Sequence, residues 1–305
     1  MKQKTLIANH IAVLLIFLFS SAGTFMNAAM QAMIDAWPAL SPTTVRMSTT
    51  LPPLVSLPVM LVIGSAVGKW ISYRSCAIMG TALIMLGGTA PYFFHPSWEV
   101  VIVFRVILGI GVGFLGIRSS LLIKSIPLEK QAAYIGYGSV LATLGTVIAS
   151  PIVGYLAEIS WYHGFLFNAF SLFPLIYIFF ALPEPEKETN GASEHKPDEK
   201  IKGRYSWRMV YYAVMQFTTC TAVFAICSGM TTYFADKNLG SALLAGTVIS
   251  IYTFSGACIN VIIAPVLKVF RGKTIAFLCL SSAVGMILLV TAPTYATVVT
   301  GVNCE

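Results

Sequence analysis

Long apolar stretches, separated by short polar breaks, follow one another along almost the whole chain. An α-helix rises about 1.5 Å per residue, so roughly 20 apolar residues cross the ~30 Å hydrocarbon core of a bilayer. Such runs are too long and too uniformly apolar for the strands of a membrane barrel. The pattern therefore predicts an all-α, polytopic membrane helix bundle with nine spans, at residues 11–33, 50–67, 76–93, 99–117, 133–156, 164–182, 210–234, 243–266 and 274–292.

Composition excludes a soluble globular protein. Hydrophobic residues make up 57% of the 305 residues, charged residues only 10%, and the mean hydropathy is +0.80. A soluble domain of this length has too small a core to hide so much apolar surface. The formal net charge of +7 then favours basic loops at a membrane surface over nucleic-acid binding.

The basic residues divide unequally between the two sides of the membrane once the spans are placed. With the amino terminus in the cytoplasm, 16 of the 19 Lys and Arg residues fall on the inner side, while Arg46 and Lys237 lie outside and Arg105 lies within a span. The positive-inside rule then predicts a multi-pass plasma-membrane protein with a cytoplasmic amino terminus. A signal peptide cleaved near Asn27 is the alternative, but the first apolar run exceeds a usual signal sequence.

One long polar segment, residues 183–206, interrupts the series of spans. Its acidic and basic residues alternate closely, as is typical of a solvated linker. We therefore predict an N-terminal six-helix bundle at 1–182, a cytoplasmic linker at 183–206 and a partial C-terminal bundle at 207–305. A weak internal repeat supports this division, because basic turns follow the second helix of each set, at 64–69 and 264–273.

Three short motifs add a family resemblance to this topology. They are Arg105-Val106-Ile107-Leu108-Gly109-Ile110-Gly111-Val112-Gly113 in the fourth span (pattern R-x-x-x-G-x-G), Ser150-Pro151-Ile152-Val153-Gly154 in the fifth (G-P-x-x-G, with Ser150 for the first glycine), and Trp161-Tyr162-His163-Gly164-Phe165 with Leu182-Pro183-Glu184 around the sixth (W-R-x-x-F and L-P-E, with Tyr162 for arginine). With these motifs, six helices and a charged linker, the chain resembles the major facilitator superfamily. The resemblance implies alternating-access transport of a small solute between two six-helix halves, with no cofactor.

The chain also departs from the family pattern. In the turn after the second span, Gly68 replaces the family's acidic residue and Ile71 its later glycine, although Lys69 and Arg74 keep the turn basic. The resemblance assigns Lys69 and Arg74 to an inner gate. The sequence shows nine spans where two six-helix halves give twelve. We therefore expect an interrupted or frameshifted gene product, with a naturally short form as the alternative.

Arg105 is the most informative single residue. An arginine within a span costs about 2.5–3.5 kcal/mol on insertion scales and usually faces a cavity or a partner. It lies six residues after Glu99, so snorkelling to the outer headgroups is the competing explanation. The resemblance implies that spans one, four and seven line the central cavity, which adds Asn27, Gln31 and Gln216 to Arg105 as substrate-pathway candidates.

Small residues and a proline are the candidates for gating or hinge motion. Gly109 and Gly113 are four residues apart, so they share one face of a helix and permit close packing against a neighbouring span. Pro151 removes a backbone hydrogen bond and is expected to kink the fifth span. The resemblance makes Pro151 and Gly154 a hinge of the transport cycle. A static packing kink is the alternative.

Other chemistry finds little support in the sequence. No Asp, Glu or His falls in the middle of a span, and the six cysteines show no C-x-x-C spacing. No glycine loop suited to phosphate is present either. We predict a non-enzymatic secondary transporter of a small organic solute, neutral or anionic, with a coupling proton or ion left open. The alternatives are a multidrug efflux exchanger and a non-transporting truncated remnant.

The orientation can be tested by labelling. A cysteine placed in the 187–204 loop is expected to be cytoplasmic, and cysteines near His95 or Lys237 are expected to be external, because of the basic bias. A membrane-impermeant maleimide applied to intact cells should react only with the external positions. Reaction with the 187–204 loop would reverse the orientation.

Overall fold

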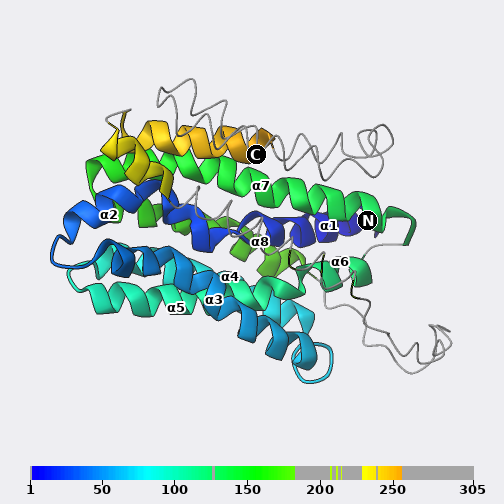
Figure 1. Cartoon of the computed structure of the whole chain (residues 1–305). Coiled ribbons are helices and arrows are strands. Elements are labelled where there is room, and N and C mark those ends of the chain that lie inside the picture. Colours follow the sequence, from blue (N-terminus) through cyan, green and yellow to red (C-terminus); the bar gives the residue numbers. More distant parts are fainter. Residues whose placement is uncertain are drawn as a thin grey trace.

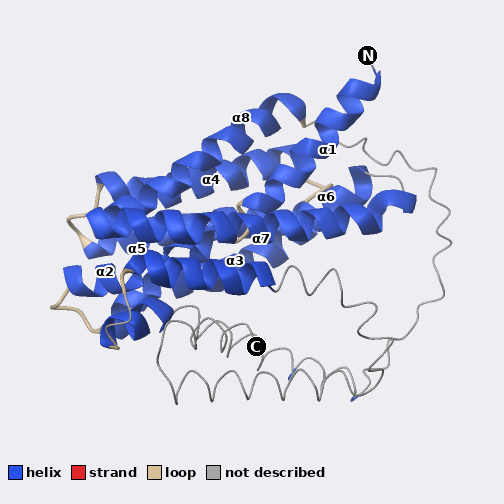
Figure 2. Cartoon of the chain, turned by 90° about the horizontal axis from the view of Figure 1, so that it is seen from above, coloured by secondary structure: helices blue, strands red, loops and turns tan. Residues whose placement is uncertain are grey.

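The described part of the chain consists almost entirely of helices (Figures 1 and 2). The computed structural model describes residues 2–125, 128–182, 207, 211, 214, 229–237 and 240–255. The helices named in Figure 1 and the 3₁₀ segments between them are α1 (Lys2–Leu18), η1 (Ala22–Ala29), α2 (Met30–Ala36), α3 (Pro42–Ala66), α4 (Tyr73–Phe93), α5 (Trp98–Phe114), η2 (Leu115–Ile117), α6 (Arg118–Ser125), α7 (Leu128–Ile159), η3 (Trp161–Ser171) and α8 (Leu172–Ala181). Further helix covers residues 229–236 and Ala242–Ser255.

The prediction of a helical membrane bundle is confirmed. Five helical stretches are long and apolar enough to cross a membrane, and one bent helix pair adds a sixth: Pro42–Ala66, Tyr73–Phe93, Trp98–Lys124, Tyr134–Ile159, Trp161–Ala181, and the pair Asn9–Leu18 with Ala22–Ala36. The 183–206 linker and the predicted span 274–292 lie outside the described residues. Most of 210–234 and the second half of 243–266 do so as well.

The first span is bent, whereas the sequence suggested one continuous run over 11–33. Its two parts meet at an angle of 41°. The hydroxyl of Ser20 donates to the carbonyl of Phe17 at 2.7 Å, and the hydroxyl of Thr24 donates to that of Ser21 at 2.9 Å. Such local side-chain bonds compete with the i to i−4 backbone ladder, so the α-helix ends at Leu18.

The second and fourth spans are longer than predicted at their polar ends. Helix α3 begins at Pro42 rather than near residue 50, because the hydroxyl of Ser41 accepts from the Thr44 amide at 3.2 Å and proline suits the first helical turn. The fourth span was expected to end at 117, but helix continues through η2 and α6 to Ser125. Arg118 stays within it, with its guanidinium 5.6 Å from the ring centre of Phe17.

Close approach of backbones joins α3, α4 and α5. A Cβ added to Gly109 would lie 2.8 Å from the Pro52 carbonyl oxygen, and one added to Gly113 would lie 2.6 Å from Cβ of Val59. The predicted packing face of Gly109 and Gly113 is therefore confirmed. On the other side of α5, Gly87 of α4 approaches the Leu108 amide nitrogen. Without a hydrophobic force between helices in lipid, such small-residue contacts hold the bundle together.

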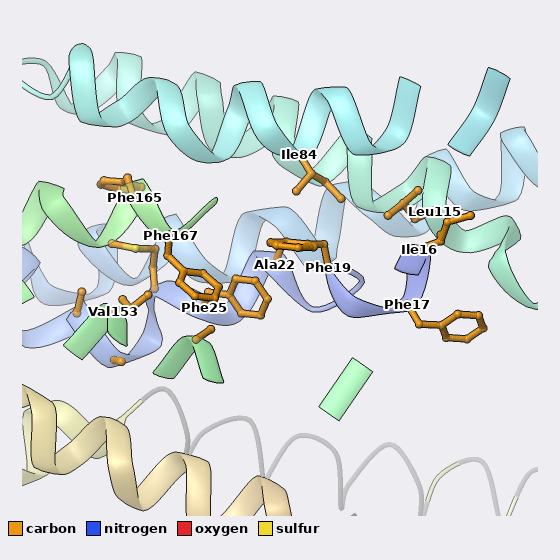
Figure 3. Close-up of a cluster of buried hydrophobic side chains, with 14 of the residues drawn as sticks. Ile16, Phe17, Phe19, Ala22, Phe25, Ile84, Leu115, Val153, Phe165 and Phe167 are labelled. Atoms are coloured by element: carbon orange, nitrogen blue, oxygen red, sulfur yellow. The ribbon is translucent and has the colours of Figure 1, made fainter. Parts of the chain in front are cut away.

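Aromatic side chains of the bent first span and of the sixth span pack against one another (Figure 3). The rings of Phe25 and Phe167 meet edge to face with their centres 5.4 Å apart. Phe19 lies against both, at 6.1 Å and 6.5 Å. Edge-to-face pairs at this distance suit the ring quadrupoles and add to the packing energy.

The glycine contacts give a stability prediction. In Gly87→Ala the new Cβ would lie 2.5 Å from the Leu108 nitrogen, so overpacking should lower the free energy of unfolding by about 1–3 kcal/mol. Gly64→Ala is the matched control, because nothing lies within 4 Å of its added Cβ. Thermal unfolding in detergent should show a lower midpoint for the first variant alone, and equal midpoints would refute the close packing.

Candidate functional site: a buried arginine between membrane helices

Arg105 lies wholly inside the bundle. Its side chain is 0% exposed, so it does not snorkel to the surface. The guanidinium carbon sits 4.5 Å from the ring centre of Phe165 in η3. None of its three nitrogens, Nε, Nη1 and Nη2, has a hydrogen-bond partner among the described residues.

This environment is costly for a cation. Unpaired buried charges and unfilled hydrogen-bond donors lose several kcal/mol relative to water. Contact with the face of the Phe165 ring recovers about 2 kcal/mol when the pair is desolvated. The N–H donors of Arg105 therefore need acceptors from outside the described residues, such as a solute, water or another side chain.

The register between α5 and α3 gives the part of α3 that lies at the level of Arg105. Gly113 contacts Val59, and Gly109, one turn earlier on α5, contacts Pro52, about two turns earlier on α3. One further turn back along both helices, Arg105 reaches the level of Ser48. Ser48 is 0% exposed, and its hydroxyl has no hydrogen-bond partner in the described part of the chain.

Asn27 joins this level from the first span. A Cβ added to Gly23 would lie 3.0 Å from Cβ of Pro52, so Asn27, about one turn further along η1, comes beside the turn of Ser48. The side-chain oxygen of Asn27 also has no partner among the described residues. Three helices thus bring buried polar atoms to one level, which we call the polar cluster (Asn27, Ser48 and Arg105).

The other two pathway candidates, Gln31 and Gln216, are not part of the polar cluster. Gln31 follows Asn27 along the first span, and its amide donates to the carboxylate of Asp35 at 2.8 Å, which leaves the amide oxygen of Gln31 without a described partner. Gln216 lies outside the described residues. Ser48 was not among the residues predicted from the sequence, because a serine in a helix is usually bonded to its own backbone and gives no signal of its own.

The proline motif of the fifth span lies against the helix Ala242–Ser255. Gly154 of α7 approaches the carbonyl of Ala242, and Gly246 approaches the carbonyl of Ser150. In addition, the hydroxyl of Ser250 donates to the carbonyl of Val147 at 2.8 Å. Figure 1 shows this helix, in orange, running along α7. The motif therefore lies where the first six helices contact the later ones.

The basic turn after α3 is held by its own backbone. Gly68 has a φ of +82°, a left-handed conformation that favours glycine, and its amide donates to the Ile71 carbonyl at 2.8 Å. Lys69 is exposed. Arg74 donates to the carbonyl of Phe179 in α8 at 2.7 Å. The replacement of the family's acidic residue by Gly68 thus fits a turn that requires glycine.

An apolar hollow lies apart from the polar cluster. It has a volume of about 460 Å³ and lies between α1, η1, α7, η3 and α8. On α7 it is lined by Gly145, Ile148 and Ile152, on the face roughly opposite Ser150 and Gly154 at 100° per residue. It therefore faces away from the helix Ala242–Ser255. No group of acidic, histidine or cysteine side chains in the described ranges could hold a metal ion.

The fold has well-matched relatives among solved structures. A D-xylose–proton symporter superposes with a TM-score of 0.71 at 13% identity, over 98% of this chain and 79% of that one. A partially occluded, inward-open xylose transporter from E. coli gives 0.67 at 12% identity, over 99% and 82%. A bacterial homologue of the human lysosomal transporter Spinster, inward-facing and occupied, gives 0.67 at 14%, over 99% and 71%.

At these identities the structural matches show the fold alone. No curated protein sequence matches the chain. The family model described as Major Facilitator Superfamily matches residues 7–303, nearly the whole chain. The chain therefore belongs to the major facilitator superfamily.

Proposed function

We propose that the protein carries a small organic solute, neutral or anionic, across the plasma membrane by alternating access, with its amino terminus in the cytoplasm. Family membership makes it a transporter of the secondary type. The proposal adds the class of solute, the mechanism, the membrane and the orientation. A coupling proton or ion remains open, as some relatives, such as the D-xylose–proton symporter, use one.

The observation that carries the proposal is the unfilled guanidinium of Arg105. It is fully buried and lacks a described hydrogen-bond partner, in a helix that the family resemblance places beside the central path. Ser48 and Asn27 contribute further unfilled polar atoms at the same level. A cation with no described carboxylate nearby disfavours a cationic solute and favours an anionic or neutral polar one.

The main alternative, an efflux exchanger, has one observation in its favour. The motif Ser150-Pro151-Ile152-Val153-Gly154, which in the family is linked to exchangers, packs against the helix Ala242–Ser255 through Ser150 and Gly154. A pronounced hinge at Pro151 would support exchange. Counterflow in proteoliposomes, with the same solute on both sides, separates obligatory exchange from net uptake.

Arg105 provides the direct test of the proposed function. In a low-dielectric site, loss of one charge-assisted hydrogen bond costs about 1.5–3 kcal/mol. Arg105→Ala should therefore slow initial uptake of a transported organic anion by roughly ten- to a hundredfold. Arg105→Lys should recover only part of the rate, because an ammonium keeps the charge but loses the planar fork.

The assay is initial uptake into proteoliposomes, normalised to reconstituted protein, for a panel of radiolabelled small carboxylates and their neutral amides. Lys130→Ala is the control for loss of a cation, because Lys130 is an exposed basic residue in the first turn of α7 and lies outside the polar cluster. Equal rates for wild type, Arg105→Ala and Arg105→Lys would remove Arg105 from the transport path.

A further inference from the structure

Among the described residues, three hydrogen bonds between the first six helices and the later ones lie at one end of the bundle. Arg46, near the start of α3, donates from Nη2 to the hydroxyl of Thr232 at 3.2 Å. The hydroxyl of Thr231 donates to the carbonyl of Asn27 at 3.4 Å. The amide of Leu243 donates to the carboxylate of Glu158 at 2.9 Å. We call these three contacts the distal seal, because the start of α3, the end of α7 and the segment 229–237 lie at the end of the bundle opposite the amino terminus (Figure 1).

Each contact starts from a different helix of the first set. Arg46 belongs to α3, Asn27 to η1 and Glu158 to the end of α7. Their partners belong to only two segments, 229–237 and Ala242–Ser255. The seal therefore joins the first, second and fifth spans to two later helices. Next to the distal seal, Gly154 and Gly246 bring α7 and the helix Ala242–Ser255 into backbone contact.

Of the three contacts, the one between Glu158 and Leu243 has the clearest electrostatic explanation. Leu243 is in the first turn of the helix Ala242–Ser255, where amides have no acceptor within the helix. The carboxylate of Glu158 fills one of them and lies at the positive end of the helix dipole. This bond crosses between helices 85 positions apart in sequence, so the end of α7 acts as a cap for a helix of the later set.

We propose that the distal seal closes one side of the transport path and that Glu158 is the positioning residue that holds it. This inference rests on the proposed alternating-access function. Glu158 is exposed and Arg46 is only partly buried, so water competes with both bonds and each is individually weak. Weak polar contacts suit a closure that must break and re-form in every cycle. Asn27 connects the seal to the polar cluster, because its carbonyl takes part in one and its side chain in the other.

Hydrogen–deuterium exchange of the full chain in lipid nanodiscs tests the seal without any substrate. Glu158→Gln and Glu158→Ala remove the charge that caps the helix Ala242–Ser255. Arg46→Ala removes the hydrogen bond to Thr232. Glu99→Gln is the matched control, because Glu99 is an exposed carboxylate at the end of another span, and its described hydrogen bonds are to Ser97 and to its own backbone.

With Glu158→Ala, amides of residues 243–246 should exchange about two- to fivefold faster, the factor that corresponds to an exposed charged contact of about 0.5–1 kcal/mol. Glu158→Gln should fall between this variant and wild type, and Arg46→Ala should raise exchange in 229–237. Peptides from the α3–α5 contact, such as 106–114, should not change in any variant, and Glu99→Gln should match wild type throughout.

Two results would overturn the proposal: unchanged exchange at 243–246 in both Glu158 variants, or an equal rise in 106–114, which would show a general loss of structure. Failure of the transport proposal is separate, because it appears as absent uptake with the exchange pattern intact. If the Glu158 variants keep both uptake and the wild-type exchange pattern, the seal is refuted and the transport proposal is not.

Discussion

Hydrocarbon offers no hydrogen bonds, so every polar group inside a membrane bundle must find its partner within the protein. This constraint explains the helical architecture and the close glycine contacts among α3, α4 and α5. It also explains why the break in the first span is tolerated, since hydroxyls of Ser20 and Thr24 bond to freed carbonyls. Against this background, Arg105 stands out, because all three of its side-chain nitrogens are buried without a partner among the described residues.

Arg105 is the clearest exception to this constraint. Its ring contact with Phe165 stabilises the charge but leaves its N–H donors unfilled. Ser48 and Asn27 stand at the same level with unfilled atoms of their own. A purely structural arginine would be expected to have its fork bonded within the bundle. The polar cluster is therefore better explained as a place where an external group binds, and its connection to the distal seal through Asn27 links binding to closure.

Much of the fold could be predicted from the sequence, because spans depend on apolar length. The class of bundle and the packing face of Gly109 and Gly113 followed from periodicity alone. The bend after Leu18 and the early start of α3 did not, because both depend on hydroxyl bonds that hydropathy does not register. Arg105 stood out as a charge within a span, but Ser48 and the contacts of Arg46 and Glu158 depend on how helices distant in sequence meet, which no single-chain pattern encodes.

The central claim is that Arg105 is kept for binding at a cost to stability. The most direct measurement is the thermal unfolding midpoint of Arg105→Met, compared with Arg46→Met, in the absence of solute. Replacing a buried charge that has no partner among the described residues by an apolar side chain of similar length should raise the midpoint, whereas Arg46→Met should lower it by breaking the bond to Thr232. A lower midpoint for Arg105→Met would mean that a partner already holds Arg105 in the resting protein and would contradict this account.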